Sequence, residues 1–270
     1  MANTIPVMDK EAKKTGDIAL PNQFSEAYRP DLIRRSVLSL QSRARQAYGA
    51  DPKAGLRHSS KLSKRRRKYR GCYGFGISRV NRKIHTRRGT RFFWVGTFSP
   101  QTRGGRRSHA PKAYKNFEQK INVKENRKAI RSAISAGIDS NVVAERGHVV
   151  PTQFPFTLDS SLESLSKTAD VQKALDTLGL KEELIRAAVK KVRPGRGKTR
   201  GRKYKRAKGP LIVVSKECPL MKAAANVAGV DVAICNALNA ELLAPGADAG
   251  RLTLWTKAAI EKMTTENIFG

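Results

Sequence analysis

The pattern of apolar and polar positions is clearest in the C-terminal third of the chain. Leu211-Ile212-Val213-Val214 is an uninterrupted apolar run, which is typical of a strand that is buried on both faces of a parallel sheet. Two further strands are predicted at 230–234 and 251–255, and helical segments are predicted at 219–227, 237–242 and 257–263. Thr256 precedes the last helix and is of a residue type that caps helices.

Helical spacing recurs in the first two thirds of the chain. Apolar residues three or four apart predict helices at 31–46, 122–136, 170–178 and 184–189, and a short strand is expected at 147–153. Pro30 suits a helix start, Asn122 and Glu125 resemble a capping box, and Asp170 is a candidate cap. Strands that alternate with helices indicate an α/β fold. We therefore expect an open, mostly parallel sheet of about four strands flanked by helices.

The charge of the chain changes this picture. The 270 residues include 54 Lys and Arg against 22 Asp and Glu, a formal net charge of +32. Residues 52–117 hold 20 basic residues and no acid, and residues 184–216 hold 13 basic residues and no acid. The other 171 residues hold 21 basic and 22 acidic residues, so they are almost neutral. Such segregation favours a polyanionic partner, because a surface made only for solubility mixes both signs.

These counts divide the chain into parts. We expect a globular body formed by residues 1–46 and 116–270, which is large enough to fold alone. Residues 47–115 are expected to form an extended loop inserted in the body, and residues 190–209 a second basic RNA-binding segment. The first acid-free segment also holds nine of the 17 aromatic residues. Aromatic rings among cations are typical of RNA binding, since rings stack on unpaired bases while cations meet phosphates.

Two other interpretations of the first segment are a disordered basic tail and a small separate domain. Tails are poor in aromatic residues, and the hydrophobic periodicity of the segment is weak throughout. We therefore expect a loop that becomes ordered on its partner.

Other kinds of function find little support in the sequence. No apolar stretch is long enough to span a bilayer, and Asp9, Glu11 and Asp17 disfavour a secretion or import signal. Cys72, Cys218 and Cys235 are far apart, as expected of reduced cytosolic thiols without a zinc site.

The sequence holds no convincing catalytic or cofactor motif. Lys198 and Thr199 lack the first glycine of a phosphate loop, because position 192 is a valine. Three of the four histidines lie in the acid-free first segment, where no carboxylate can orient them. The acidic residues are expected mostly at helix starts and solvent-exposed faces. We expect neither an enzyme nor a cofactor.

The order of the segments resembles the L-four family of large-subunit ribosomal proteins, in its archaeal and eukaryotic form. The resemblance is carried by RPDLIRR at 29–35, GGRRSHAPK at 104–112, NRKAIRSA at 126–133, GHVV at 147–150, GRGK at 195–198 through Gly209-Pro210, LAPG at 243–246, GRL at 250–252 and WT at 255–256. It spans nearly the whole chain. One departure is the aromatic run Phe92-Phe93-Trp94, because loops of the family are usually rich in Gly and Arg.

The resemblance implies a primary rRNA-binding protein that acts early in assembly of the large ribosomal subunit, in the cytoplasm. Its partners would be large-subunit rRNA, neighbouring ribosomal proteins and the nascent polypeptide, because the loop would line the exit tunnel with a tip near 64–92. The candidate RNA-binding residues are Arg57, Lys61, Lys64, Arg65, Arg66, Arg67, Lys68, Arg70, Arg79, Arg82, Lys83, Arg87, Arg88, Arg91, Trp94, Arg103, Arg106, Arg107, His109, Lys112, Arg193, Arg196, Lys198, Arg200, Arg202, Lys203, Lys205 and Arg206.

Two alternatives remain at this level. A basic architectural DNA- or RNA-binding protein outside the ribosome would share the charge, although it usually presents a helix or ribbon to a groove. An RNA-modifying enzyme with a parallel sheet would need a cofactor loop after a strand, and Val214-Ser215-Lys216 lacks the glycines.

Overall fold

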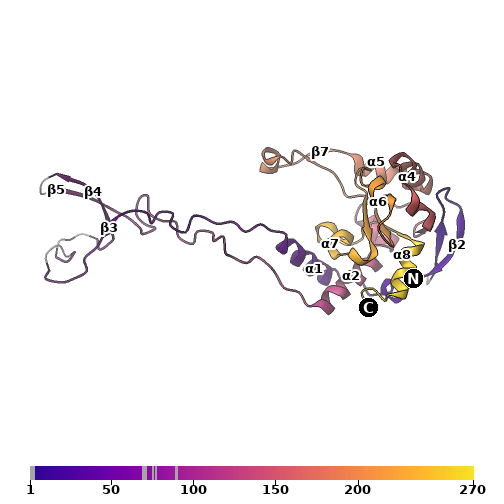
Figure 1. The fold of residues 1–270 in the computed structure, drawn as a ribbon, viewed down its shortest axis with the longest axis horizontal. Helices are drawn as coiled ribbons and strands as arrows, with labels where there is room; N and C mark the ends of the chain where they lie inside the picture. The colour runs from indigo at the N-terminus through magenta and orange to yellow at the C-terminus, as the bar shows by residue number, and fades with distance from the viewer. Residues whose placement is uncertain (1–3, 69–71, 75, 77, 89–90) are drawn as a thin grey trace. The chain divides into compact units, whose positions relative to one another are not determined.

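The computed structural model describes residues 4–68, 72–74, 76, 78–88 and 91–270, and over 84–94 it describes the backbone alone. The chain divides into two compact units. Residues 1–43 and 118–270 form the first unit, which we call the body. Residues 44–117 form the second unit, which we call the inserted segment. Figure 1 shows the elements of each unit along the chain.

The body is built on a six-stranded sheet. In order across the sheet, the strands are β10 (Asp231–Ile234), β9 (Leu211–Val214), β11 (Thr253–Thr256), β6 (Thr157–Leu158), β1 (Thr4–Met8) and β2 (Lys14–Ala19). All neighbouring pairs are parallel except β1 and β2, which pair antiparallel at one edge. The expectation of an α/β fold with an open, mostly parallel sheet is confirmed, although the sheet has six strands instead of about four.

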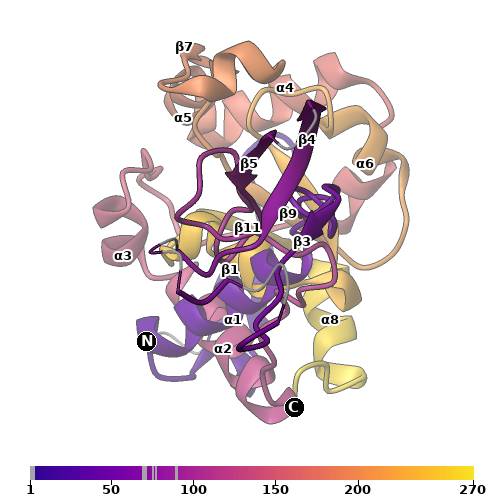
Figure 2. The ribbon, with the colours of Figure 1, turned by 90° about the vertical axis from the view of Figure 1, so that its left-hand side faces the viewer.

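Helices cover both faces of this sheet. They are α1 (Pro30–Arg43), α2 (Val123–Ala136), α3 (Ser140–Glu145), α4 (Thr168–Leu175), α5 (Lys181–Ala188), α6 (Pro219–Ala224), α7 (Ala240–Leu243) and α8 (Lys257–Thr265). Short turns of other helix types lie at η1 (Asn22–Phe24), η2 (Ser160–Ser164), η3 (Asp176–Leu180), η5 (Cys235–Ala237) and η6 (Pro245–Ala247). In Figure 2, α4, α5 and α6 lie on one side of β9 and β11, and α1, α2 and α8 lie on the other.

The apolar run in β9 explains why both faces are covered. Successive side chains of a strand point to opposite faces. Ile212 and Val214 pack in the core beneath α4, α5 and α6, whereas Leu211 and Val213 pack in the core beneath α1, α2 and α8. All four residues are buried, so this strand requires apolar residues at every position.

Three strands escape sequence analysis for identifiable reasons. β1 contains Pro6, which normally argues against a strand. β2 is an exposed edge strand with a largely polar sequence, and β6 has only two residues. The predicted strand at 147–153 is wrong. Its backbone is irregular with turns at 147 and 152–153, and the N–H of Val149 donates to the Glu183 carboxylate at 3.0 Å instead of to a neighbouring strand.

The predicted helix boundaries have a mixed outcome. Pro30 does begin α1, and the Thr256 hydroxyl accepts a hydrogen bond from the Ala259 N–H at 3.3 Å, so it caps α8. Asn122 precedes α2 without a side-chain capping bond, and Asp170 lies in the first turn of α4 rather than at its cap.

The inserted segment contains a three-stranded antiparallel sheet of β3 (Ser60–Lys61), β4 (Arg82–Arg88) and β5 (Arg91–Gly96). The weak hydrophobic periodicity of this segment predicts no strands. Nearer its ends the segment is a stem of two chain passes in contact, which we define as residues 44–57 and 103–117. The Ala50 N–H donates to the Pro111 carbonyl at 3.0 Å.

Candidate nucleic-acid interface

The second acid-free stretch forms a hairpin, here called the basic hairpin (residues 190–208). Its strands β7 (Lys191–Val192) and β8 (Tyr204–Lys205) pair antiparallel around the turn η4 (Arg196–Arg200). Gly195 and Gly201 flank this turn with φ of 75° and 78°, a backbone conformation that L side chains rarely adopt. Seven predicted RNA-binding residues of the hairpin are exposed, namely Arg196, Lys198, Arg200, Arg202, Lys203, Lys205 and Arg206.

Arg193 differs from these residues because it is half-buried inside the hairpin. Its guanidinium donates to the carbonyls of Arg202 at 3.1 Å and Tyr204 at 3.3 Å. The Lys190 ammonium lies 3.7 Å from the centre of the Tyr204 ring, within cation–π distance. These contacts hold the two strands together, so the hairpin has internal order despite its charge.

A buried carboxylate anchors the base of the hairpin in the body. Both Glu183 and His148 are buried, and the Glu183 carboxylate contacts the His148 Nδ1 at 2.7 Å. Arg186 bonds to the same carboxylate at 2.6 and 2.7 Å and donates to the Lys208 carbonyl at 2.8 Å. Burial opposes ionisation of Glu183, but hydrogen bonds from Arg186, His148 and Val149 together lower its pKa to about 2.

A second buried group holds the chain where the hairpin returns to β9. Only 1% of the Arg251 surface is exposed. Its guanidinium donates to the carbonyls of Gly209 and Leu242 at 2.9 Å each and to the Asp231 carboxylate at 2.6 Å. Asp231 also pairs with Lys208 at 2.9 Å. Burial lowers the pKa of Arg251, and Asp231 opposes that effect.

Two acidic residues are buried although they lie at helix starts, where acidic residues are expected. Glu183 is in the first turn of α5 and Glu163 is in the first turn of η2. The Glu163 carboxylate accepts hydrogen bonds from the Ser215 N–H and hydroxyl and from the Thr256 hydroxyl, at 3.1, 3.0 and 2.6 Å. It therefore links η2 to the ends of β9 and β11.

In the inserted segment, most of the described candidate residues are exposed. These are Arg57, Lys61, Lys64, Arg65, Arg66, Arg67, Lys68, Arg79, Arg103, Arg106, Arg107, His109 and Lys112. Arg82 and Lys83 are half-buried in β4. The prediction for Arg70 lies outside the described residues, and so do the side chains of Arg87, Arg88, Arg91 and Trp94.

Some of these cations already have partners within the segment. Arg57 forms an ion pair with Asp51. Arg66 and Arg79 lie 5.4 and 5.1 Å from the centre of the Tyr73 ring. Cations that are held on aromatic rings are restricted in position, which lowers the entropy lost when they bind an anion.

The stem holds an aromatic and cationic cluster that is not among the predicted RNA-binding residues. The rings of Tyr48 and Phe117 are stacked, with centroids 5.7 Å apart and planes within 10°. The Arg45 guanidinium lies 4.4 Å from the Phe117 centroid, and the Lys115 ammonium lies 5.4 Å from it. The sequence does contain a sign of this cluster, because each ring has a basic residue within three positions. Only the structure brings the two chain passes together.

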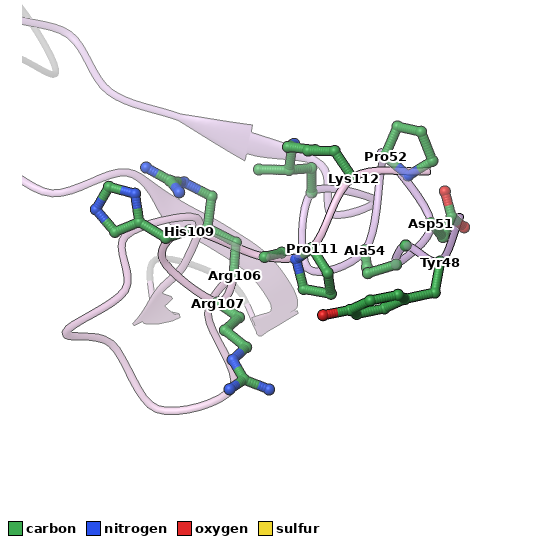
Figure 3. Close-up of a pocket in the computed structure, with 13 residues that line it drawn as sticks. Tyr48, Asp51, Pro52, Ala54, Arg106, Arg107, His109, Pro111 and Lys112 are labelled. Carbon is green, nitrogen blue, oxygen red and sulfur yellow. The ribbon is translucent and has the colours of Figure 1, made fainter. Parts of the chain in front are cut away.

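Beside this cluster the stem has a hollow of about 640 Å³, shown in Figure 3. Its walls are largely apolar and its rim is cationic. The lining residues are Tyr48, Gly49, Ala50, Asp51, Pro52, Ala54, Leu56, Arg106, Arg107, His109, Ala110, Pro111 and Lys112.

Other chemistry has little basis in the part of the chain that the structure describes. Within those residues, no three His, Cys, Asp or Glu side chains are grouped as metal ligands would be. The three cysteines are free thiols. Across the same residues, no helix is long and apolar enough to cross a membrane.

An α/β fold whose excess of positive charge lies in two acid-free stretches is typical of structural RNA-binding proteins. Comparison with known proteins agrees. Residues 18–266 match the Ribosomal protein L4/L1 family. A large ribosomal subunit protein uL4 of Nanoarchaeum equitans is 46% identical, over 98% of this chain and 99% of that protein. The uL4 protein of Methanococcoides burtonii is 45% identical, over 96% of this chain and 97% of that protein.

The chain therefore belongs to the Ribosomal protein L4/L1 family. This confirms the resemblance to the L-four family of large-subunit ribosomal proteins, which rested on the order of short segments. Its role is structural and not enzymatic, and its association is with the ribosome and its RNA.

Proposed function

We propose that this protein is an rRNA-binding structural constituent of the large ribosomal subunit. The observation that carries the proposal is the separation of charge. The entire excess of positive charge lies in two acid-free stretches, and most of their described cations are exposed. A charge of this density favours a polyanionic partner, and the phosphates of rRNA would neutralise it.

The two extensions have different tasks in this proposal. The basic hairpin is fixed at its base by Glu183, Arg186 and Arg251, so it presents its cations at a defined place on the body. The inserted segment reaches several rRNA domains, and its inner part forms part of the wall of the polypeptide exit tunnel. Neighbouring ribosomal proteins and the nascent polypeptide are its further partners.

The proposed order of events follows from the energetics. Ordering a long segment costs conformational entropy, which phosphate contacts and base stacking offset only when rRNA is present. We therefore propose that the protein binds rRNA early in subunit assembly, while the RNA is still open enough to enclose the segment. Recognition relies on RNA shape and single-stranded features, because phosphate contacts carry no sequence information.

Sedimentation tests this proposal directly. The full chain, expressed with a tag in its native host, is expected to remain with the large subunit through a sucrose gradient in high salt. Recovery in the free fraction under that condition would contradict the proposal. A second experiment measures competition between rRNA and duplex DNA of equal length for the protein. An architectural protein outside the ribosome would release rRNA when the DNA is added.

A further inference from the structure

The stem contains an exposed tyrosine ring that is stacked on one face. Among the described residues, no ring stacks on its other face. Tyr48 is 58% exposed. Phe117 stacks on one face of its ring, and Arg45 lies over Phe117 in turn. Phe117 does not line the hollow, whereas Tyr48 does. The ladder of Arg45, Phe117 and Tyr48 therefore ends at the hollow.

The chemistry of the hollow suits a nucleotide. Pro52, Ala54, Leu56 and Pro111 give apolar walls, which suit the faces and edges of a base. The volume of about 640 Å³ falls in the range of roughly 300–1,000 Å³ that is usual for small-molecule sites. In Figure 3 the Tyr48 ring lies below Pro111 and Ala54.

The rim of the hollow favours a phosphate over a neutral or cationic occupant. Arg106, Arg107 and Lys112 contribute three exposed cations. The one carboxylate, that of Asp51, is engaged, because it pairs with Arg57 and accepts a hydrogen bond from the Lys53 N–H at 2.9 Å. The field at the rim is therefore positive.

The frame of the hollow is fixed by close contact between the two chain passes. A Cβ atom on Gly55 would lie 2.6 Å from the Cα of Arg106, closer than real Cβ contacts allow. His109 has a φ of 48°, a conformation that is uncommon for residues other than glycine and that is concentrated at functional sites. Close contact between the two passes therefore fixes the backbone that carries the ring and the cations.

We propose that this hollow is a nucleotide-binding subsite, in which an unpaired rRNA base stacks on Tyr48 and its phosphate meets Arg107 and Lys112. The site rests on the proposed function, because rRNA is its source of nucleotides. It adds a defined contact for one base at the stem, where phosphate contacts alone would fix no particular nucleotide.

Substitution of Tyr48 in the full chain tests the site. Affinity for a large-subunit rRNA transcript is measured for the wild type, Tyr48→Ala, Tyr48→Leu and Tyr48→Phe, with Tyr28→Ala as a matched exposed tyrosine on the body. Loss of stacking is expected to weaken binding by about 5- to 100-fold for Ala and Leu. Phe and the Tyr28 variant are expected to stay within about twofold of the wild type.

Two readouts separate stacking from other causes. The slope of affinity against salt is expected to be the same for wild type and Tyr48→Leu, because no charge is removed. A short single-stranded RNA with one 2-aminopurine is expected to lose fluorescence on binding the wild type and to lose less on binding Tyr48→Leu.

The outcomes distinguish the site from the proposed function. If the wild type failed to bind rRNA, the proposed function would fall. If it bound rRNA and Tyr48→Ala and Tyr48→Leu bound equally well, the nucleotide subsite alone would be overturned. If the Tyr48 variants kept full rRNA affinity but lost a neighbouring protein from the ribosomal particle, the hollow would bind a protein and not a base. That result would also overturn the proposal.

Discussion

At the scale of single residues, the chain uses buried charges to place its exposed ones. Glu183 lies in the body and touches no solvent, yet it fixes Arg186, which in turn holds the Lys208 carbonyl at the base of the basic hairpin. Arg251 holds the chain where the hairpin returns to β9, because it binds the Gly209 carbonyl and the Asp231 carboxylate. Buried charges are tolerated only when they are fully paired, and these residues satisfy that condition with one another.

The lowered pKa of Glu183 predicts how the body responds to acid. Its ordinary value is 4.5 and its value in the fold is about 2. The native state therefore holds the charged form more strongly than the unfolded state does. This stabilisation is complete above about pH 4.5 and is lost as pH falls toward 2.

The substitution Glu183→Gln is expected to lower the free energy of unfolding at neutral pH by about 3 kcal/mol, the linkage equivalent of that shift. The difference from wild type should shrink as pH falls from 4.5 to 2, as measured by urea unfolding at each pH. Glu182→Gln is the control, because its side chain is exposed on the same helix. A difference that is constant with pH would disprove the linkage.

At the scale of elements, two extensions are stabilised in different ways. The basic hairpin is a short ribbon tied to the body by side chains. The stem of the inserted segment depends on backbone contact, since a Cβ on Gly49 would lie 2.2 Å from the Ala113 nitrogen. Its glycine permits that approach and a side chain would not.

Gly49→Ala is therefore expected to separate the two passes of the stem. Overpacking of this kind costs about 1–3 kcal/mol, so the rate of trypsin cleavage within the stem should rise by roughly 5- to 100-fold when cleavage follows local opening. Gly16→Ala in β2 is the control, because a Cβ there meets nothing within 4 Å. Equal cleavage of both variants would show that the close approach does not stabilise the stem.

The exposed cations of the basic hairpin predict a different result. Arg196→Ala, Lys198→Ala and Arg200→Ala should each weaken rRNA binding in a way that does not depend on RNA sequence. Each should reduce the log–log salt slope by about 1 if that side chain meets a phosphate. Lys173→Ala, an exposed cation on α4, should leave the slope unchanged. Filter binding over a salt series measures both.

At the scale of the whole molecule, stability and binding are assigned to different parts of the chain. The body has a core on each face of its sheet, and among the described residues both cores are built from the body alone. The residues outside the two acid-free stretches are almost neutral, so that part of the chain avoids the self-repulsion that the two stretches carry.

Deleting residues 60–95 should therefore leave the body folded, with cooperative thermal unfolding close to that of the full chain, and should remove most rRNA affinity. For the full chain, about ten phosphate contacts give an expected log–log salt slope of −7 to −9. A slope shallower than about −3, or full affinity in the deleted chain, would contradict the assignment of binding to the extensions.

The sequence by itself determined the α/β class, because apolar runs such as Leu211-Ile212-Val213-Val214 alternate with segments of helical spacing. It also determined that an RNA-like polyanion is the partner, since charge is counted without coordinates. Only the tertiary structure decided which residues meet across the chain. Glu183 and His148 are 35 positions apart, and Tyr48 and Phe117 are 69 apart. No local period encodes such pairs, because they arise when separate segments pack together.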